Sequence, residues 1–239
     1  MSHPGITYGG VLHRGKLFGE LMVEALRAIA IHFSALGFES LRYKAVPYIY
    51  HETPSGDDLY ALFRLSATRE RCDLSTAIDL SIPVVSSQRR RRGLATAISQ
   101  GVVIVERLDF IRDFWKILEE NLAQKYNAAP THSFDEISTL FSLFPDNIRL
   151  IVGLIGSKVV AGTILFTTSR VVHAQYIASN KAGLEACALD AVFDHCIAQA
   201  ASQGKCYFDF GISTEKEGEH LNNNLYSFKR QFGGGGSGS

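Results

Sequence analysis

The stretch "KCYFDFGIST" (residues 205–214) places one acid, Asp209, inside a run of aromatic side chains. The spacing of Tyr207, Phe208 and Phe210 predicts a buried strand that ends at Gly211. An ionised carboxylate is costly to bury among aromatic rings unless it is paired, hydrogen-bonded or directed into a wet cleft. Two interpretations stay open: a structural aspartate whose oxygens are satisfied, or the floor of a functional site.

The composition is that of a soluble globular protein, with 46% hydrophobic residues and 24 basic against 24 acidic residues in a chain of 239. This balance gives no overall charge that would favour DNA or a membrane surface, and we predict neither partner. No apolar run reaches the roughly 20 residues of a membrane-spanning helix, and the N-terminal "MSHPGITYGG" lacks the features of a signal peptide, so we expect a cytoplasmic protein. The four cysteines have no metal-binding spacing, and no metal site is predicted.

The chain contains one order of predicted elements twice: strand, long helix, strand, short helix. In the first copy these elements are residues 5–12, 19–35, 38–47 and 57–64. In the second copy they are residues 170–180, 183–203, 205–213 and 223–230. The last helices read "DDLYALFR" and "NNLYSFKR", and the other elements recur at similar spacing, so the sequence indicates a duplicated unit.

The region between the copies has no counterpart at the N-terminus. It predicts a helix beginning at the arginine run, a strand, a helix capped by Asp109, and a helix with a capping box formed by Ser133 and Glu136. These are residues 89–100, 101–108, 109–126 and 133–144. The segment that follows reads as three strands separated by turns at residues 155–157 and 169–170.

This order resembles the GNAT acyltransferase fold, and its use in tandem resembles the FemAB and CelD-like branch of that superfamily. The resemblance covers nearly the whole chain and rests on "HPGITYGG", "RRRRGLATAISQGV", "PTHSFDEISTLFSLFPD", "YFDFGIST" and "NNLYSFKRQFGG". It implies an α/β fold with mixed α+β sheets, in which residues 1–86 form a first GNAT-like lobe that is N-terminally incomplete. Residues 87–232 form the second lobe, and residues 233–239 form a flexible Gly/Ser tail.

The resemblance implies acyl transfer to an amine, with acetyl-CoA or another acyl-CoA as donor. In GNAT folds two neighbouring strands separate, and the pantetheine arm of the donor lies in the gap. Here the gap falls between "HAQYIAS" and "CYFDFGIS", which makes Ile177, Ala178, Gly183 and Leu184 the candidate cofactor-binding residues. The segment "NKAGLEA" departs from the family's pyrophosphate loop because it holds only one glycine.

Four residues are candidates for the chemistry, each with a structural alternative. Asp209 is an amine-orienting residue or base, or else a structural acid. By resemblance, Lys229 stabilises developing negative charge, or it is a solvated lysine. Tyr176 protonates the leaving group or belongs to the core, and His132 is a base or a surface residue. The alternation of a strand predicts that His173 faces away from Tyr176.

The candidate acceptor-binding residues are Tyr8, Arg91, Glu217 and Tyr226. The predicted acceptor is an amino sugar of a cell-envelope polysaccharide or its nucleotide-linked precursor. Two alternatives remain: an aminoacyl-tRNA-dependent transferase of the FemAB type, with tRNA as partner, and a non-catalytic binding or scaffold protein with a degenerate fold. The second lobe lacks its last strands, so an exposed sheet edge would favour a homodimer.

Overall fold

The computed structural model describes residues 8–238. The chain divides into two compact units, one of residues 1–72 with the last two residues and one of residues 73–237. The boundary between the units therefore falls after Cys72 in the sequence, whereas the predicted boundary falls after residue 86. The reason is a long-range pairing: residues 74–79 pair with the strand that contains Asp209 and so belong to the second unit.

The first unit is built from helices. Its elements are α1 (Glu20–Ala35), the 3-10 turn η1 (Tyr48–Tyr50) and α2 (Asp57–Arg64), and both α-helices lie where the sequence predicts them. Met22, Val23 and Leu26 of α1 are buried and pack in one cluster with Ala61 of α2. The periodicity of the two helices is therefore explained by a small core of their own.

The strands predicted at residues 5–12 and 38–47 are wrong where the structure describes them. Residues 8–12 and 38–47 form no strand, and residues 5–7 lie outside the described part. The two segments touch through the Gly9 amide, which donates to the Lys44 carbonyl at 3.0 Å. Alternating side chains give a segment an apolar face, but a strand also needs a ladder of backbone partners.

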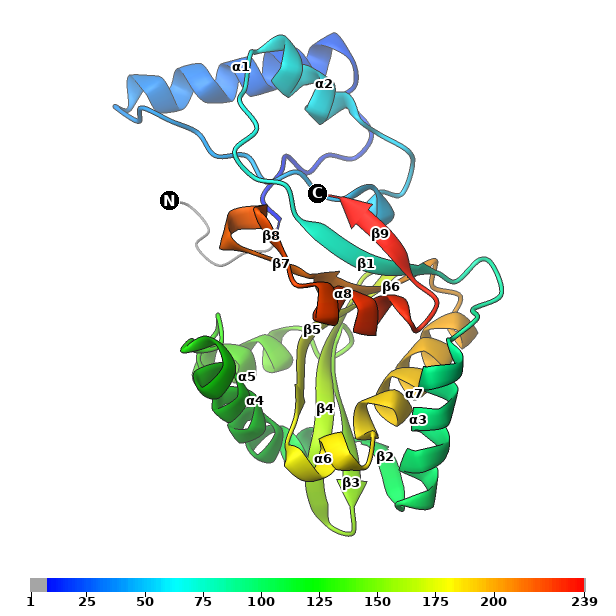
Figure 1. The fold of residues 1–239 in the computed structure, drawn as a ribbon. Coiled ribbons are helices and arrows are strands. Elements are labelled where there is room, and N and C mark those ends of the chain that lie inside the picture. The colour runs from blue at the N-terminus through cyan, green and yellow to red at the C-terminus, as the bar shows by residue number, and fades with distance from the viewer. Residues whose placement is uncertain (1–7, 239) are drawn as a thin grey trace. The chain divides into compact units, whose positions relative to one another are not determined.

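The second unit contains a seven-stranded sheet in the order β2-β3-β4-β5-β6-β1-β9 (Figure 1). Neighbouring strands are antiparallel from β2 to β5 and between β6 and β1, while β5 and β6 are parallel. The strands are β1 (Leu74–Asp79), β2 (Val102–Glu106), β3 (Ile148–Ile155), β4 (Lys158–Thr167), β5 (Val171–Ser179), β6 (Tyr207–Ile212) and β9 (Gly235–Gly238). A two-stranded sheet of β7 (Thr214–Glu215) and β8 (His220–Leu221) follows β6.

Helices cover both faces of this sheet. One buried cluster joins α4 and α5 to β3, β4 and β5, and a second joins α7 and α8 to the opposite face. The helices are α3 (Gln88–Ser99), α4 (Ile111–Tyr126), α5 (Phe134–Leu143), α6 (Lys181–Glu185), α7 (Ala188–Ser202) and α8 (Asn223–Arg230), with 3-10 turns η2 (Leu108–Phe110) and η3 (Lys216–Gly218). A mixed α/β fold is thereby confirmed.

The local signals of this unit are confirmed in part. Ser133 and Glu136 form the predicted capping box of α5. Asp109 does not cap α4, because it lies inside η2 and pairs with Arg107. The long helix predicted at 183–203 is two helices, α6 and α7, because Cys187 adopts a left-handed backbone conformation with φ of 53°.

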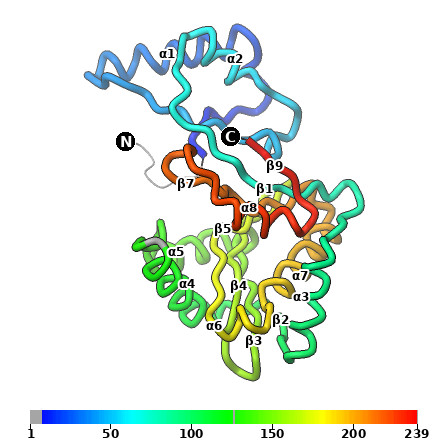
Figure 2. Tube along the Cα trace, in the orientation of Figure 1, coloured from blue at the N-terminus to red at the C-terminus, as the bar shows by residue number. Residues whose placement is uncertain are grey.

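The far side of the sheet differs from the prediction. The strand containing Asp209 is not an edge, because β1 pairs with it and β9 lies beyond β1 (Figure 2). The Gly/Ser segment predicted to be a flexible tail supplies β9, whose pairing uses backbone groups that need no side-chain pattern. The argument for a homodimer through an open edge at this strand is therefore lost. None of the helices formed by residues 8–238 is long and apolar enough to cross a bilayer.

Candidate active site

The parallel strands β5 and β6 share only their first three residues. Their register pairs Val171, Val172 and His173 with Tyr207, Phe208 and Asp209, and pairing stops there. Beyond this point β5 continues against β4 as far as Ser179, while β6 continues against β1 as far as Ile212. The two strands thus fork at the His173–Asp209 pair, and the edge of β5 that follows has no partner in β6.

A bulge interrupts β5 just after the fork. Tyr176 lies opposite Ile164 of β4, but Ala174 lies opposite Leu165, so Gln175 is an extra residue. An extra residue shifts the alternation of a strand by one and turns the side chains after it to the other face.

The bulge brings His173 and Tyr176 to the same face of the sheet. Val172 and Ala174 pack in the cluster with α7, so His173 between them points to the face covered by α4. Tyr176 packs in the cluster with α4. The prediction that the two side chains face opposite ways is therefore wrong, because simple alternation does not hold across Gln175.

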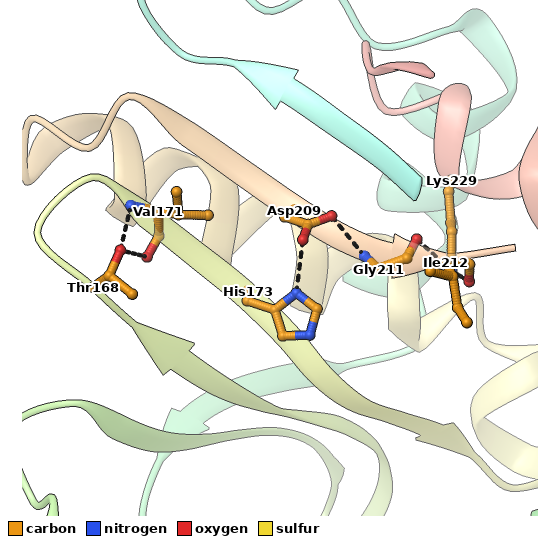
Figure 3. Close-up of polar contacts among 7 residues, drawn as sticks. All are labelled: Thr168, Val171, His173, Asp209, Gly211, Ile212 and Lys229. Atoms are coloured by element: carbon orange, nitrogen blue, oxygen red, sulfur yellow. Dashed lines mark hydrogen bonds and ion pairs between the residues drawn. The ribbon is translucent and has the colours of Figure 1, made fainter. Parts of the chain in front are cut away.

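Asp209 is fully buried, and its carboxylate is hydrogen-bonded through both oxygens (Figure 3). Oδ1 accepts from the Gly211 amide at 2.8 Å, and Oδ2 lies 2.9 Å from Nδ1 of His173. Gly211 has a φ of 71°, and a Cβ there would lie 3.2 Å from the His173 ring. Glycine therefore allows both the turn of the chain and the close approach of the imidazole.

Lys229 reaches the end of β6 from α8. Its ammonium donates to the carbonyls of Gly211 at 3.2 Å and Ile212 at 2.6 Å, and the residue is only 3% exposed. Burial lowers the pKa of Lys229 to about 8, against a smaller opposing effect of the Asp209 charge. The site thus holds a positive charge that is poorly solvated. Such a charge attracts a nearby negative charge more strongly than a solvated one does.

Tyr176 and His132 form a second pair. The Tyr176 hydroxyl accepts from the His132 amide at 3.2 Å and lies 2.6 Å from Nδ1 of its ring. The Tyr176 ring also packs edge-on against Trp115. Burial raises the pKa of Tyr176 above its ordinary value, so the hydroxyl is held protonated. The core interpretation of Tyr176 is thereby confirmed, and its hydroxyl has a polar partner in His132; its role as a proton donor stays a prediction.

The four candidate cofactor residues separate into two pairs. Ile177 and Ala178 lie on the part of β5 that has left β6, where they pair only with β4. Gly183 and Leu184 lie in α6, and the Gly183 amide donates to the Asn180 side chain at 2.9 Å. Gly183 is required by packing, because a Cβ there would lie 2.2 Å from the Val160 carbonyl oxygen.

The four candidate acceptor residues lie on separate segments of the chain, and two of them, Glu217 and Tyr226, follow β6. Tyr8 belongs to the first unit, where its ring contacts Tyr50. Glu217 is exposed in η3. The Tyr226 hydroxyl lies close to Gly236 of β9, because a Cβ built on that glycine would be 2.9 Å from it.

The arginine run divides between two environments. Arg90 is buried, pairs with Asp190 of α7 at 3.1 Å, and stacks on Phe228 and Phe232 at the α8 end of the chain. Arg91 lines a cavity of about 540 Å³ between α3, α7 and residues 80–86. The cavity is mostly apolar and lies on the α7 side of the sheet, away from the Asp209 side chain. Arg90 thus contacts one residue next to Lys229, Phe228 of α8, and one residue just beyond the end of that helix, Phe232.

A family model described as "Acetyltransferase (GNAT) domain" matches residues 86–230, more than half of the chain. The protein belongs to this GNAT acetyltransferase family. A search of curated proteins finds no match. The family match includes α3, the whole of β5 and β6, and Lys229 on α8.

Solved structures show the same fold at low sequence identity. FemX aligns with a TM-score of 0.65 at 11% identity, over 90% of this chain and 75% of FemX. A conserved protein of unknown function from Bacteroides thetaiotaomicron aligns with 0.61 at 9% identity, over 90% and 74%. L-PGS from Bacillus licheniformis aligns with 0.53 at 16% identity, over 77% of this chain and 63% of its own, so the chain spans less than two thirds of that structure. The family match confirms the resemblance to GNAT acyltransferases, and the alignments show that the fold is similar to that of FemX.

Sequence reasoning missed His173 as a site residue. Its position next to Asp209 depends on the register between β5 and β6, and its face depends on the bulge at Gln175. The available signal is a histidine in one predicted strand and an acid in the next. In the structure each is the third residue of its strand, but the predicted strands begin at residues 170 and 205, which puts the two out of step by one position.

Proposed function

We propose that the protein is an acyltransferase that moves an acyl group from an acyl-CoA thioester to an amine bound at the β5–β6 fork. The observation that carries this proposal is the edge of β5 beyond His173, which has no partner in β6. Such an edge can pair with an extended chain that carries amide groups, as a sheet edge pairs with an added strand. The pantetheine arm of coenzyme A is a chain of this kind.

The donor would lie along Ile177 and Ala178, with its thioester near the fork. The amine would attack the thioester carbon, and negative charge would develop on the carbonyl oxygen. A buried ammonium such as that of Lys229 stabilises this charge more in the transition state than in the ground state. The Tyr176 hydroxyl, held protonated beside His132, would give a proton to the departing thiolate.

The acceptor we propose is an amino sugar of a cell-envelope polysaccharide or its nucleotide-linked precursor, in the cytoplasm. This choice rests on the family resemblance. Tyr226 and Glu217 lie on the segment after β6 and would contact the acceptor from that side.

One observation favours a second donor, an aminoacyl-tRNA. The Gly183 amide is already bonded to Asn180, so the turn after β5 offers one amide fewer to a pyrophosphate. An aminoacyl ester needs no such loop. The fold likeness to FemX is compatible with either donor.

Isothermal titration of acetyl-CoA into the protein, followed by an acetyl-transfer assay with glucosamine, tests the proposal. We expect micromolar binding and measurable transfer. Lys229→Met should lower the transfer rate by about 10²-fold to 10³-fold with little change in donor affinity, because its charge acts on the transition state. Lys158→Met is the matched control, since Lys158 is exposed at the β3–β4 turn.

The outcomes separate three functions. Binding with transfer supports the acyl-CoA enzyme. If acetyl-CoA does not bind but a charged tRNA supports transfer, the protein is an acyltransferase whose donor is aminoacyl-tRNA and not acyl-CoA. Absence of binding and of transfer from either donor rejects catalysis and leaves a binding or scaffold protein.

A further inference from the structure

The two groups at the fork differ in what they can offer a substrate. Asp209 is fully buried, and both of its oxygens are engaged by protein groups. The His173 side chain is 12% exposed and reaches Asp209 with only one ring nitrogen, Nδ1 (Figure 3). A substrate at the fork would therefore meet the imidazole and not the carboxylate.

The contact with Asp209 decides which nitrogen of His173 is basic. An ionised carboxylate only accepts hydrogen bonds, so the proton in this contact sits on Nδ1. The other nitrogen, Nε2, then carries the lone pair. Among the described residues, His173 makes no hydrogen bond besides the one to Asp209. Nε2 is thus an available base with a fixed orientation.

His173 is better placed to act as a base at the fork than His132, the other candidate base. His132 uses Nδ1 and its amide on the Tyr176 hydroxyl, and it comes from the segment before α5. His173 stands at the last pair of β5 and β6, where the strands separate. Because of the bulge, Tyr176 follows on the same face, about 10 Å further along the strand. A base and an acid on one strand face can act on the two sides of one thioester carbon, the base on the arriving amine and the acid on the departing sulfur.

We propose that His173 is the catalytic base of the acyl transfer and that Asp209 is its positioning residue. This inference rests on the proposed function and changes the role that the sequence suggests for Asp209. Nε2 takes a proton from the amine nitrogen as that nitrogen forms a bond to the thioester carbon. The carbon–sulfur bond breaks, the thiolate leaves and takes a proton from Tyr176, and the imidazolium returns its proton through solvent, which restores both side chains.

The test compares His173→Gln, His173→Gly and Asp209→Asn with the wild type. The two histidine variants are expected to lower kcat by about 10²-fold to 10⁴-fold, the usual contribution of general base catalysis, while the dissociation constant of acetyl-CoA changes less than threefold. Added imidazole should restore part of the rate of His173→Gly and none of the rate lost in Asp209→Asn. His195→Gln is the matched control, because His195 is an exposed histidine of α7.

A second measurement does not depend on activity or on the folding of the variants. Nitrogen-15 NMR of the wild type, labelled at histidine, should show the neutral His173 ring as the tautomer with its proton on Nδ1 and none on Nε2. The reverse tautomer would overturn the proposal. So would wild-type transfer that His173→Gln leaves unchanged, with the proposed function intact. If the wild type transfers from neither donor, the proposed function fails and the base role fails with it.

Discussion

Replacing Lys229 by methionine should change how the stability of the second unit depends on pH. The ammonium is almost completely buried, and its partners are two backbone carbonyls, those of Gly211 and Ile212. Burial is the main cause that lowers the pKa of Lys229 from 10.5 to about 8. Methionine has a similar length but no proton to lose, so a comparison of the two proteins isolates this titration.

The magnitude follows from the number of protons bound. Between pH 8 and 10.5 the unfolded chain keeps the lysine proton and the folded chain has lost it. The free energy of unfolding of the wild type therefore rises with pH by about 1.4 kcal/mol per pH unit in this interval, a total of about 3 kcal/mol. This contribution is fully present above pH 10.5 and is lost as the pH falls through 8.

Urea unfolding monitored by tryptophan fluorescence measures the effect, because Trp115 is buried in the second unit and is the single tryptophan of the chain. The stability of the wild type minus that of Lys229→Met is expected to increase by about 2 to 3 kcal/mol from pH 7.5 to pH 10. The same difference for Lys158→Met should stay constant. A constant difference for Lys229→Met would refute the reasoning, since the lysine would then keep its charge throughout.

Three further changes test the packing around the site. Arg90→Met should destabilise the second unit by about 3 to 5 kcal/mol, because it leaves the Asp190 charge buried without a partner, and adding Asp190→Asn should recover part of this loss in urea unfolding. Burial raises the pKa of Asp190 and lowers that of Arg90, so no recovery in the double variant would contradict the argument. Gly183→Ala should cost about 1 to 3 kcal/mol or more in the same assay, since its Cβ would lie 2.2 Å from a carbonyl oxygen of β4. Tyr176→Phe should cost about 1 to 3 kcal/mol by leaving the His132 amide without its acceptor, and it should slow acyl transfer without weakening donor binding; a stability equal to that of the wild type would contradict the buried pair.

The elements that sequence reasoning places correctly are those with a local signal. The capping box at Ser133 fixes the start of α5, and the apolar runs of residues 148–179 fix β3, β4 and β5. The elements that were missed or predicted wrongly depend on distant strand partners or on the backbone alone. Residues 74–79 become a strand through a partner more than a hundred residues away, and β9 forms from glycines that carry no pattern. In the first unit, alternating residues 38–47 have no ladder to join.

The candidate site divides in the same way. The resemblance to a known family singles out Asp209 and Lys229 without placing them next to each other, and the structure brings both to the end of β6, where each contacts Gly211. It also brings together Tyr176 and His132, 44 residues apart in sequence. Sequence reasoning missed His173 because strict alternation of side chains assumes an uninterrupted strand. The extra residue at Gln175 instead puts Tyr176 on the same face as His173.

The burial of Asp209 among aromatic rings now has a physical account that separates its two interpretations. The carboxylate is tolerated because the Gly211 amide and the His173 ring satisfy its oxygens, so it is structural in the ordinary sense. Because both carboxylate oxygens are occupied by these hydrogen bonds, Asp209 does not contact a substrate directly, and its contact with His173 fixes the tautomer of that ring. The buried acid at the fork therefore acts through the residue beside it. That residue is His173, which the register of β5 and β6 places opposite Asp209 of "YFDF".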